Sequence, residues 1–232
     1  MKVLALDAST EMCTVALGGE QGFVGRSVVA GQRHSELLLP MIQALLAESG
    51  TAVDALDGIA FGSGPGSFTG LRIACGVAQG LALGAGLPLI GIPTLLAMAE
   101  VARQRDGSCR VVAALDARMR EVYVAAYEYE GSSWREHIAP SVMAPEAAPL
   151  PPGSNWLGAG GGFAAYPALR ERLKVALARC DTAITPAASA IGALALTGFV
   201  AGTGVAARDA APLYVRHRVA LTTAERSAGS VL

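Results

Sequence analysis

Two aspartates end apolar segments at matching places in the chain. Asp7 ends the strand-like run that begins at Lys2, and Asp116 ends a second run, Val111 to Leu115. Carboxylates at two strand ends that face each other across a cleft can hold a Mg2+-bound phosphate or activate a water. An aspartate before a turn can equally cap its own hairpin. The residues alone leave both interpretations open.

A glycine-dense segment, Gly62 to Arg72, joins a strand-like run to a helix-like run. Glycines before a helix expose backbone N–H groups, which suit an anion or another stretch of backbone. The segment is not a P-loop, because no Gly-Lys-Ser/Thr follows, and it matches neither G-x-G-x-x-G nor G-x-S-x-G. Ser67 is therefore expected to cap the helix. The residues singled out in this glycine loop are Gly64, Gly66, Ser67, Thr69 and Arg72.

A second glycine run, Gly158 to Gly162, also lies between a predicted strand and a predicted helix. Together with the two aspartates it predicts a residual nucleotide cleft formed by Asp7, Asp116 and Gly160. The usual Asp-x-Gly-Thr phosphate turn, however, reads Asp7-Ala8-Ser9-Thr10 here. A serine in place of glycine obstructs the close backbone approach that a phosphate needs. We therefore expect weak nucleotide binding or none, and no resident cofactor.

The histidines and cysteines do not form a ligand set in the sequence. His34, His137 and His217 are isolated, and the four cysteines include no C-x-x-C pair. No basic, apolar leader precedes the first strand. We expect a reduced, cytoplasmic protein without a metal site. A nucleophile and its base could be paired only by guessing, so a protease or other hydrolase has little support.

The composition favours a well-packed globular protein over a free-standing nucleic-acid binder. Of 232 residues, 52% are hydrophobic and 16% are charged, against about 25% charged in an average domain. The formal net charge is -1, which leaves no electrostatic excess to attract a nucleic-acid backbone or an anionic membrane. Two uncharged stretches, Ile73 to Ala99 and Thr182 to Ala207, are interrupted by glycines and prolines. We expect buried helices and strands there, and no membrane span.

The order of the predicted elements indicates the fold. Three strands in a row imply an antiparallel meander, and helices and strands alternate after it. This βββαβαβα order is that of the ribonuclease-H-like fold, a mixed sheet with helices on both faces. The predicted strands are Lys2–Asp7, Met12–Leu17, Phe23–Val29, Gly58–Phe61 and Leu87–Ile92, and the predicted helices are His34–Glu48, Phe68–Ala85 and Pro93–Gln104.

The second half repeats the first. Leu6-Asp7-Ala8 is followed by Val15-Ala16, and Leu115-Asp116-Ala117 is followed at the same spacing by Val124-Ala125. Two tandem ribonuclease-H-like halves describe the actin, Hsp70 and sugar-kinase superfamily. We expect a first domain over residues 1–105, a second over 106–216 and a tail over 217–232. The later elements are strands Val111–Leu115, Val122–Tyr127, Trp134–Ile138 and Trp156–Gly158, an irregular insert Pro140–Gly153, and helices Phe163–Leu173 and Ala187–Phe199.

The helices His34–Glu48 and Phe68–Ala85 are apolar around too much of their circumference. The apolar side chains of the first span an arc of about 200°, whereas one face packed on a sheet needs about 100°. The second carries Gly76, Gly80 and Gly84 at i, i+4 and i+8, a groove that fits another helix. We predict a partner surface; the alternative is cover by the rest of the chain. Its predicted residues are His34, Leu37, Leu38, Met41, Leu45, Ile73, Gly76, Val77, Gly80 and Leu81.

Several segments together resemble the TsaB (YeaZ) family. The resemblance implies a subunit needed to place threonylcarbamoyl on N6 of the adenosine beside the tRNA anticodon. It implies two partners, the paralogous transferase TsaD and the ATPase TsaE, with tRNA contacted only through the complex, and it allows a homodimer when the chain is alone. The segments are Leu4–Thr10, His34–Pro40, Gly64–Arg72, Leu115–Arg118, Glu121–Tyr123 and Pro212–Arg216.

The transferase paralogue carries a His-x-x-x-His metal pair on the helix after its last first-domain strand. The corresponding positions here are Thr94 and Met98, which do not replace metal-binding imidazoles. The resemblance therefore implies a non-catalytic scaffold. The runner-up is an independent actin-like ATPase or kinase that uses Asp7, Asp116 and the second glycine run, and a protease comes third.

Overall fold

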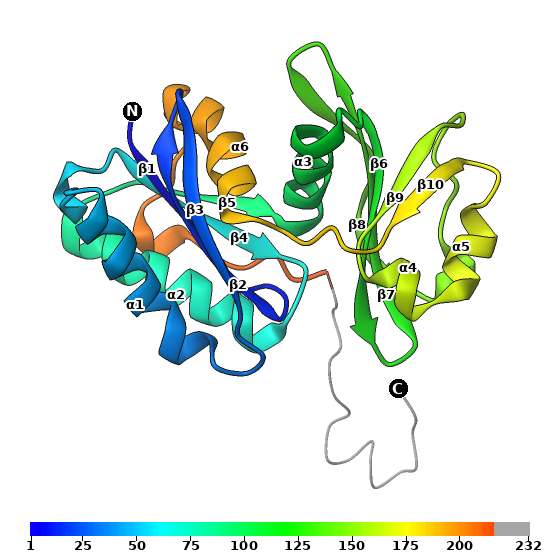
Figure 1. Ribbon diagram of the computed structural model, residues 1–232, viewed down its shortest axis with the longest axis horizontal. Coiled ribbons are helices and arrows are strands. Elements are labelled where there is room, and N and C mark those ends of the chain that lie inside the picture. Colours follow the sequence, from blue (N-terminus) through cyan, green and yellow to red (C-terminus); the bar gives the residue numbers. More distant parts are fainter. Residues whose placement is uncertain (216–232) are drawn as a thin grey trace, which may run out of the picture.

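The computed structural model describes residues 1–215, which form two five-stranded mixed sheets flanked by helices (Figure 1). The strands of the first sheet are β1 (Val3–Asp7), β2 (Met12–Gly19), β3 (Gly22–Val29), β4 (Gly58–Gly64) and β5 (Leu89–Pro93). The strands of the second sheet are β6 (Arg110–Arg118), β7 (Glu121–Glu130), β8 (Ser133–Met143), β9 (Trp156–Ala159) and β10 (Leu177–Asp181).

The two sheets have equivalent topologies. Their strand orders are β3-β2-β1-β4-β5 and β8-β7-β6-β9-β10. In each sheet the first three strands of the chain pair antiparallel, and the last two add in parallel. This confirms the predicted pair of ribonuclease-H-like halves. The helices are α1 (His34–Glu48), η1 (Val53–Ala55), α2 (Phe68–Ala85), α3 (Thr94–Asp106), η2 (Pro145–Ala147), α4 (Gly162–Ala165), α5 (Pro167–Leu173), α6 (Ala188–Val200) and η3 (Ala207–Asp209).

Three local predictions for the second half differ from the structure. The insert expected to be irregular is partly strand, because β8 continues to Met143. The helix expected over Phe163–Leu173 is broken at Tyr166, because Pro167 lacks a backbone N–H and starts α5 instead. Strand β10 is absent from the prediction, since an edge strand such as Leu177–Asp181, with its mixed polar sequence, has no apolar alternation to mark it.

Strand β1 lies at the centre of the first sheet and is buried on both faces. Leu4 and Leu6 belong to the core under α1 and α2, whereas Val3 and Ala5 belong to the core under α6. Successive side chains of a strand point to opposite faces. An all-apolar strand therefore requires helices on both sides of the sheet.

Helices α3 and α6 lie between the two sheets. The position of α6 corrects the prediction that each helix packs on the sheet of its own half of the chain. We expect α6 in the second half, yet Ile191 and Ala195 are fully buried against the first sheet. Helix α3 in turn packs Leu95 and Met98 into the core of the second sheet. Each helix is apolar on most sides and so can cover the inner face of either sheet. The domain boundary near residue 105 stays a prediction.

After α6 the chain stays with the first half and reaches α2. The side-chain amide of Gln79 on α2 donates to the carbonyl oxygens of Ala207 and Ala210, at 3.0 Å each. This contact holds the last described residues against the first half. Arg216 and the predicted tail, residues 217–232, lie outside the described residues.

Helix α2 is long and apolar enough to cross a membrane by length and composition. In the folded chain it instead covers the first sheet, with Ala74, Ala78 and Ala82 buried in the core. A core helix passes the same test of length and composition, so we interpret α2 as a covering helix.

Replacing Ile191 by alanine should destabilise the first sheet in particular. Truncation of a fully buried isoleucine costs about 2–5 kcal/mol. Native-state hydrogen exchange should then be faster in β1 and β2, while β6 and β7 keep their protection. Val200→Ala is the control on the same helix, because Val200 is 70% exposed. Loss of protection mainly in the second sheet would contradict the placement of α6.

Candidate functional site

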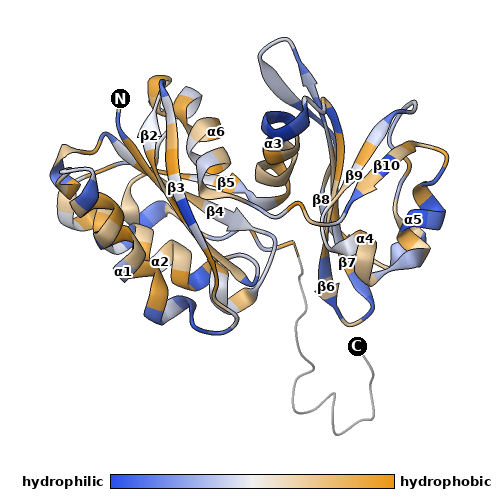
Figure 2. Ribbon diagram, in the orientation of Figure 1, coloured by the Kyte–Doolittle hydropathy of each residue, from blue (hydrophilic) through white to orange (hydrophobic). Residues whose placement is uncertain are grey.

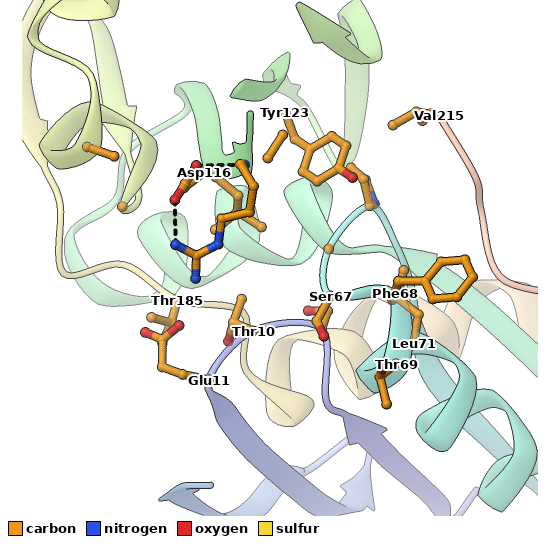
Figure 3. Close-up of a pocket in the computed structure, with 18 of the residues that line it drawn as sticks. Thr10, Glu11, Ser67, Phe68, Thr69, Leu71, Asp116, Tyr123, Thr185 and Val215 are labelled. Carbon is orange, nitrogen blue, oxygen red and sulfur yellow. Dashed lines mark hydrogen bonds and ion pairs between the residues drawn. The ribbon is translucent and has the colours of Figure 1, made fainter. Parts of the chain in front are cut away.

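A cleft of about 1200 Å³ opens between the two halves. Its walls come from the turn after β1, the start of α2, the end of β6, the adjacent strand β7 and the last described residues. Segments far apart in the sequence thus meet in one place. Around this space Figure 3 labels Thr10 and Glu11 from the turn after β1, the capping residue Ser67, Phe68 and Thr69 from α2, and Asp116, Tyr123, Thr185 and Val215.

The glycine loop packs its backbone against the turn after β1. A Cβ at Gly70 would lie 1.9 Å from the carbonyl oxygen of Ala8, and one at Gly66 would lie 2.3 Å from that of Ser9. The backbone N–H of Ser67 donates to the Ser9 carbonyl at 2.7 Å. The Ser67 hydroxyl accepts from the Gly70 N–H at 3.2 Å, which makes it the helix cap that the sequence predicts. The partner of this loop is therefore another stretch of backbone.

The last described residues run beside the glycine loop. The N–H of Leu213 donates to the carbonyl oxygen of Ser63 at 2.7 Å. Gly64 has a φ of +121°, and a Cβ there would lie 2.8 Å from the Leu213 carbonyl oxygen. Gly64 thus allows the backbone of Leu213 to approach closely. Gly64 itself does not line the cleft.

Arg72 lies between two aromatic rings at the edge of the cleft. Its guanidinium carbon is 3.2 Å from the ring centroid of Phe68 and 5.0 Å from that of Tyr214. The two rings lie 6.2 Å apart, and both side chains are about half exposed. Nothing in the sequence brings residue 214 next to residue 68, so this group was not predicted as a unit.

Asp7 does not reach the cleft, which corrects its place in the predicted nucleotide site. One oxygen of its carboxylate accepts from the N–H and hydroxyl of Ser9, at 3.1 and 2.8 Å, so Asp7 caps its own turn. The other oxygen has no hydrogen-bond partner among the described residues and faces Gly62, where a Cβ would lie 1.8 Å away. Complete burial raises the pKa of this carboxyl to about 6.

Asp116 lines the cleft and is held by its neighbours. Its carboxylate accepts from the N–H and guanidinium of Arg118, at 2.8 and 3.0 Å, and from the hydroxyl of Tyr166 at 2.7 Å. The turn that follows has three successive non-glycine residues at positive φ, Arg118, Met119 and Arg120. Such residues cost about 1–3 kcal/mol each, and the contacts of Asp116 hold Arg118 in this conformation.

Gly160 is a packing glycine, which corrects its place in the predicted cleft. A Cβ there would lie 2.2 Å from the Met98 methyl group and 2.5 Å from the Ala114 carbonyl oxygen. The neighbouring Gly161 lines the cleft instead. Thr94 and Met98 are both fully buried, and neither faces the cleft.

Helices α1 and α2 lie side by side on the outer face of the first sheet, and hydrophobic residues occur along both (Figures 1 and 2). His34, Leu38 and Leu45 are at most 5% exposed. These three side chains of α1 are buried inside the chain. This corrects the prediction that they belong to a partner surface. The remaining apolar side chains of the prediction are partly buried: Leu37, Met41, Ile73, Val77 and Leu81.

The outer surface of α2 is open along one stripe of residues. A Cβ added at Gly76, Gly80 or Gly84 would have no described atom within 4 Å. Leu83, which the prediction omits, is 78% exposed. At about 100° per residue, Leu83 falls on the same side as the three glycines. These four residues are called the α2 stripe below.

The described histidines lie outside the cleft. His34 is buried at the start of α1, and His137 pairs with Glu128 at 2.8 Å. Glu128, Glu130 and His137 place potential metal ligands within 4.8 Å of one another. Arg110 also binds Glu128 at 2.6 Å and, by its hydrogen bond, lowers the pKa of that carboxyl. An ion-pair network accounts for this group.

Known proteins resemble this chain over nearly its whole length. A family model described as "TsaD: tRNA N6-adenosine threonylcarbamoyltransferase" matches residues 21–155. The "tRNA threonylcarbamoyladenosine biosynthesis protein TsaB" of Escherichia coli (strain K12) is 40% identical over 224 residues, 95% of this chain and 96% of that protein. The protein of the same name from Haemophilus influenzae is 40% identical over 94% of this chain and 95% of its own length. The structure "YeaZ from Pseudomonas aeruginosa" has a TM-score of 0.86 and 40% identity, and covers 92% of this chain and 99% of its own.

Replacing Asp7 by asparagine should change how stability depends on pH. The pKa in the folded chain, about 6, lies above the ordinary value of 3.8. The folded state therefore binds the proton more tightly, and stability is lost as the pH rises through this window. Asp7→Asn removes that loss, which is about 3 kcal/mol above pH 6. Urea unfolding should show the variant gaining relative to the wild type between about pH 4 and about pH 7.5.

The exposed Asp54 provides the matched control. Asp54→Asn removes one surface carboxylate and so controls for the change in net charge that Asp7→Asn also makes. A difference between Asp7→Asn and the wild type that stays constant across this pH range would contradict the raised pKa.

Proposed function

The chain belongs to the TsaB family, and from this premise we propose that it is a non-catalytic subunit in the biosynthesis of threonylcarbamoyladenosine in tRNA. It acts as scaffold and activator of a TsaD-like transferase, which modifies N6 of the adenosine adjacent to the anticodon. A TsaE-like ATPase is the second partner in this proposal. The tRNA meets the chain in the complex, in the cytoplasm, and a second copy can occupy the partner surface when the chain is alone.

The observation that carries the scaffold role is the open α2 stripe. A glycine in the interior of a helix is about 0.5–1 kcal/mol less favourable than an alanine. None of the three glycines of the stripe relieves a close contact with any of residues 1–215, so packing among these residues does not require them. A helix from a partner can approach closely over glycines, and Ile73, Val77 and Leu81 add apolar surface beside them.

Three features of the interior support a non-catalytic role. Asp7 is turned away from the cleft. Met98 fills the space beside Gly160 between the central helices and the second sheet. Thr94, at the other position that corresponds to a metal ligand, is buried as well. In this proposal the chain offers the transferase a surface, and none of these three side chains lines the cleft.

An independent ATPase is the alternative, because Asp116 does line the cleft. We expect the purified chain to bind Mg-ATP weakly or not at all and to release no phosphate. One carboxylate that is already bound to Arg118 and Tyr166 is a poor Mg2+ ligand. Isothermal calorimetry and a phosphate-release assay check this. Micromolar affinity together with turnover would favour the ATPase over the scaffold.

Replacing Gly80 by leucine should weaken association with the TsaD-like partner. The new side chain has free space in the chain itself and improves helix propensity by about 1 kcal/mol, but it obstructs a partner helix. We expect at least about tenfold weaker association, equivalent to about 1.4 kcal/mol. Analytical ultracentrifugation measures association, and formation of the modified nucleoside in the reconstituted system measures function.

Gly80→Ala is the graded control, because it gains the same helix propensity with little added volume. Leu83→Glu tests the same face with a charge at an exposed position. Full association of both Gly80→Leu and Leu83→Glu would contradict the interface. Modification that proceeds equally well without the chain would contradict the proposed function.

A further inference from the structure

We propose that the cleft binds an unpaired stretch of RNA, with Arg72 and Arg118 as the two phosphate-binding groups. This inference rests on the proposed function, which makes RNA the substrate of the assembly. It adds a direct contact between this chain and the RNA. The contact is local and weak, because the net charge of -1 gives the chain no general attraction for nucleic acid.

Arg118 comes from the second half and is held at the cleft wall. Its guanidinium donates one hydrogen bond to Asp116, yet 86% of its side chain is exposed. The strained turn and the bond from its backbone N–H to Asp116 fix the start of the side chain. Strain that persists because surrounding contacts enforce it points to a function. A guanidinium held in this way keeps N–H donors free for a phosphate, which it can bind in a bidentate manner.

Arg72 comes from the first half and is held differently. Its guanidinium lies over the Phe68 ring and near Tyr214, and it donates to the Phe68 carbonyl oxygen at 3.3 Å. It forms no ion pair within residues 1–215. Each half thus supplies one restrained arginine to the same cleft.

The rest of the lining favours a strand over a small metabolite. The volume of about 1200 Å³ exceeds the roughly 300–1000 Å³ of ordinary small-molecule pockets. The half-exposed rings of Phe68 and Tyr214 offer faces on which bases stack. Hydroxyl groups along both walls suit phosphate and ribose oxygens, and Asp7 is absent as a ligand for Mg-nucleotide. These hydroxyls belong to Thr10, Ser67, Thr69, Thr182 and Thr185.

Glu11 allows a test of whether charge in the cleft determines RNA affinity, because its charge is opposite to that of the arginines. Its exposed carboxylate lines the same cleft and repels a phosphate, whereas the charge of Asp116 is compensated by Arg118. Removing the Glu11 charge should therefore tighten RNA binding. Removing either arginine should weaken it.

The test measures binding of a fluorescently labelled, single-stranded RNA oligonucleotide to the complete chain by anisotropy over a range of salt concentrations. Arg72→Gln and Arg118→Gln should each weaken binding about fivefold to tenfold at low salt. Each should also reduce the slope of log affinity against log salt by about 0.7, the value for one phosphate contact on a single strand. Glu11→Gln should bind more tightly than the wild type.

Arg135→Gln is the matched control, because Arg135 is an exposed, ion-paired arginine outside the cleft. If Arg135→Gln lost as much RNA affinity and as much salt dependence as the cleft variants, the proposal would be overturned. Competition by AMP as strong as that by the oligonucleotide would also overturn it, in favour of a mononucleotide site. Unchanged RNA binding in both cleft variants would overturn the inference even where association with the partner is normal, and the proposed function would then stand.

Discussion

Helix α2 packs on the first sheet with one side, and its opposite side is not covered by the described residues. The architecture of the first half depends on this arrangement. The inner row of α2, Ala74, Ala78 and Ala82, packs closely on the first sheet. Its outer row consists of the α2 stripe, whose glycines meet nothing within the described chain. The start of the helix is fixed by backbone contacts between the glycine loop and the turn after β1. The stripe is therefore held in a defined position, which the proposed docking of a partner needs.

The helices between the sheets impose the second constraint. Helix α3 completes the core of the second sheet, and α6 completes that of the first. Because each half depends on a helix attached to the other, neither inner face can open without exposing apolar surface. The cleft walls are thereby held opposite each other. Asp7 and Gly160 lie outside that cleft, whereas Arg72, Arg118 and Glu11 place exposed charges in it.

The duplicated architecture and the helix cap at Ser67 could be predicted because local patterns decide them: apolar strands, an aspartate before each turn, and a serine inside the glycine loop. Other features depend on distant packing. Nothing in the evenly apolar sequence of α6 indicates which sheet it covers. The wide apolar arc of α1 contains buried Leu45 as well as outer residues, and only the tertiary contacts separate them. The same holds for Asp7, whose direction is set by the absence of a side chain at Gly62.

The most direct test of the scaffold account is hydrogen–deuterium exchange of the chain with and without its TsaD-like partner. We expect new protection in α2, whose outer face carries the α2 stripe, and in the neighbouring α1. We also expect unchanged exchange in α5 and β10 at the far side of the second sheet. Protection confined to the second half, with α1 and α2 unaffected by the partner, would contradict the scaffold account.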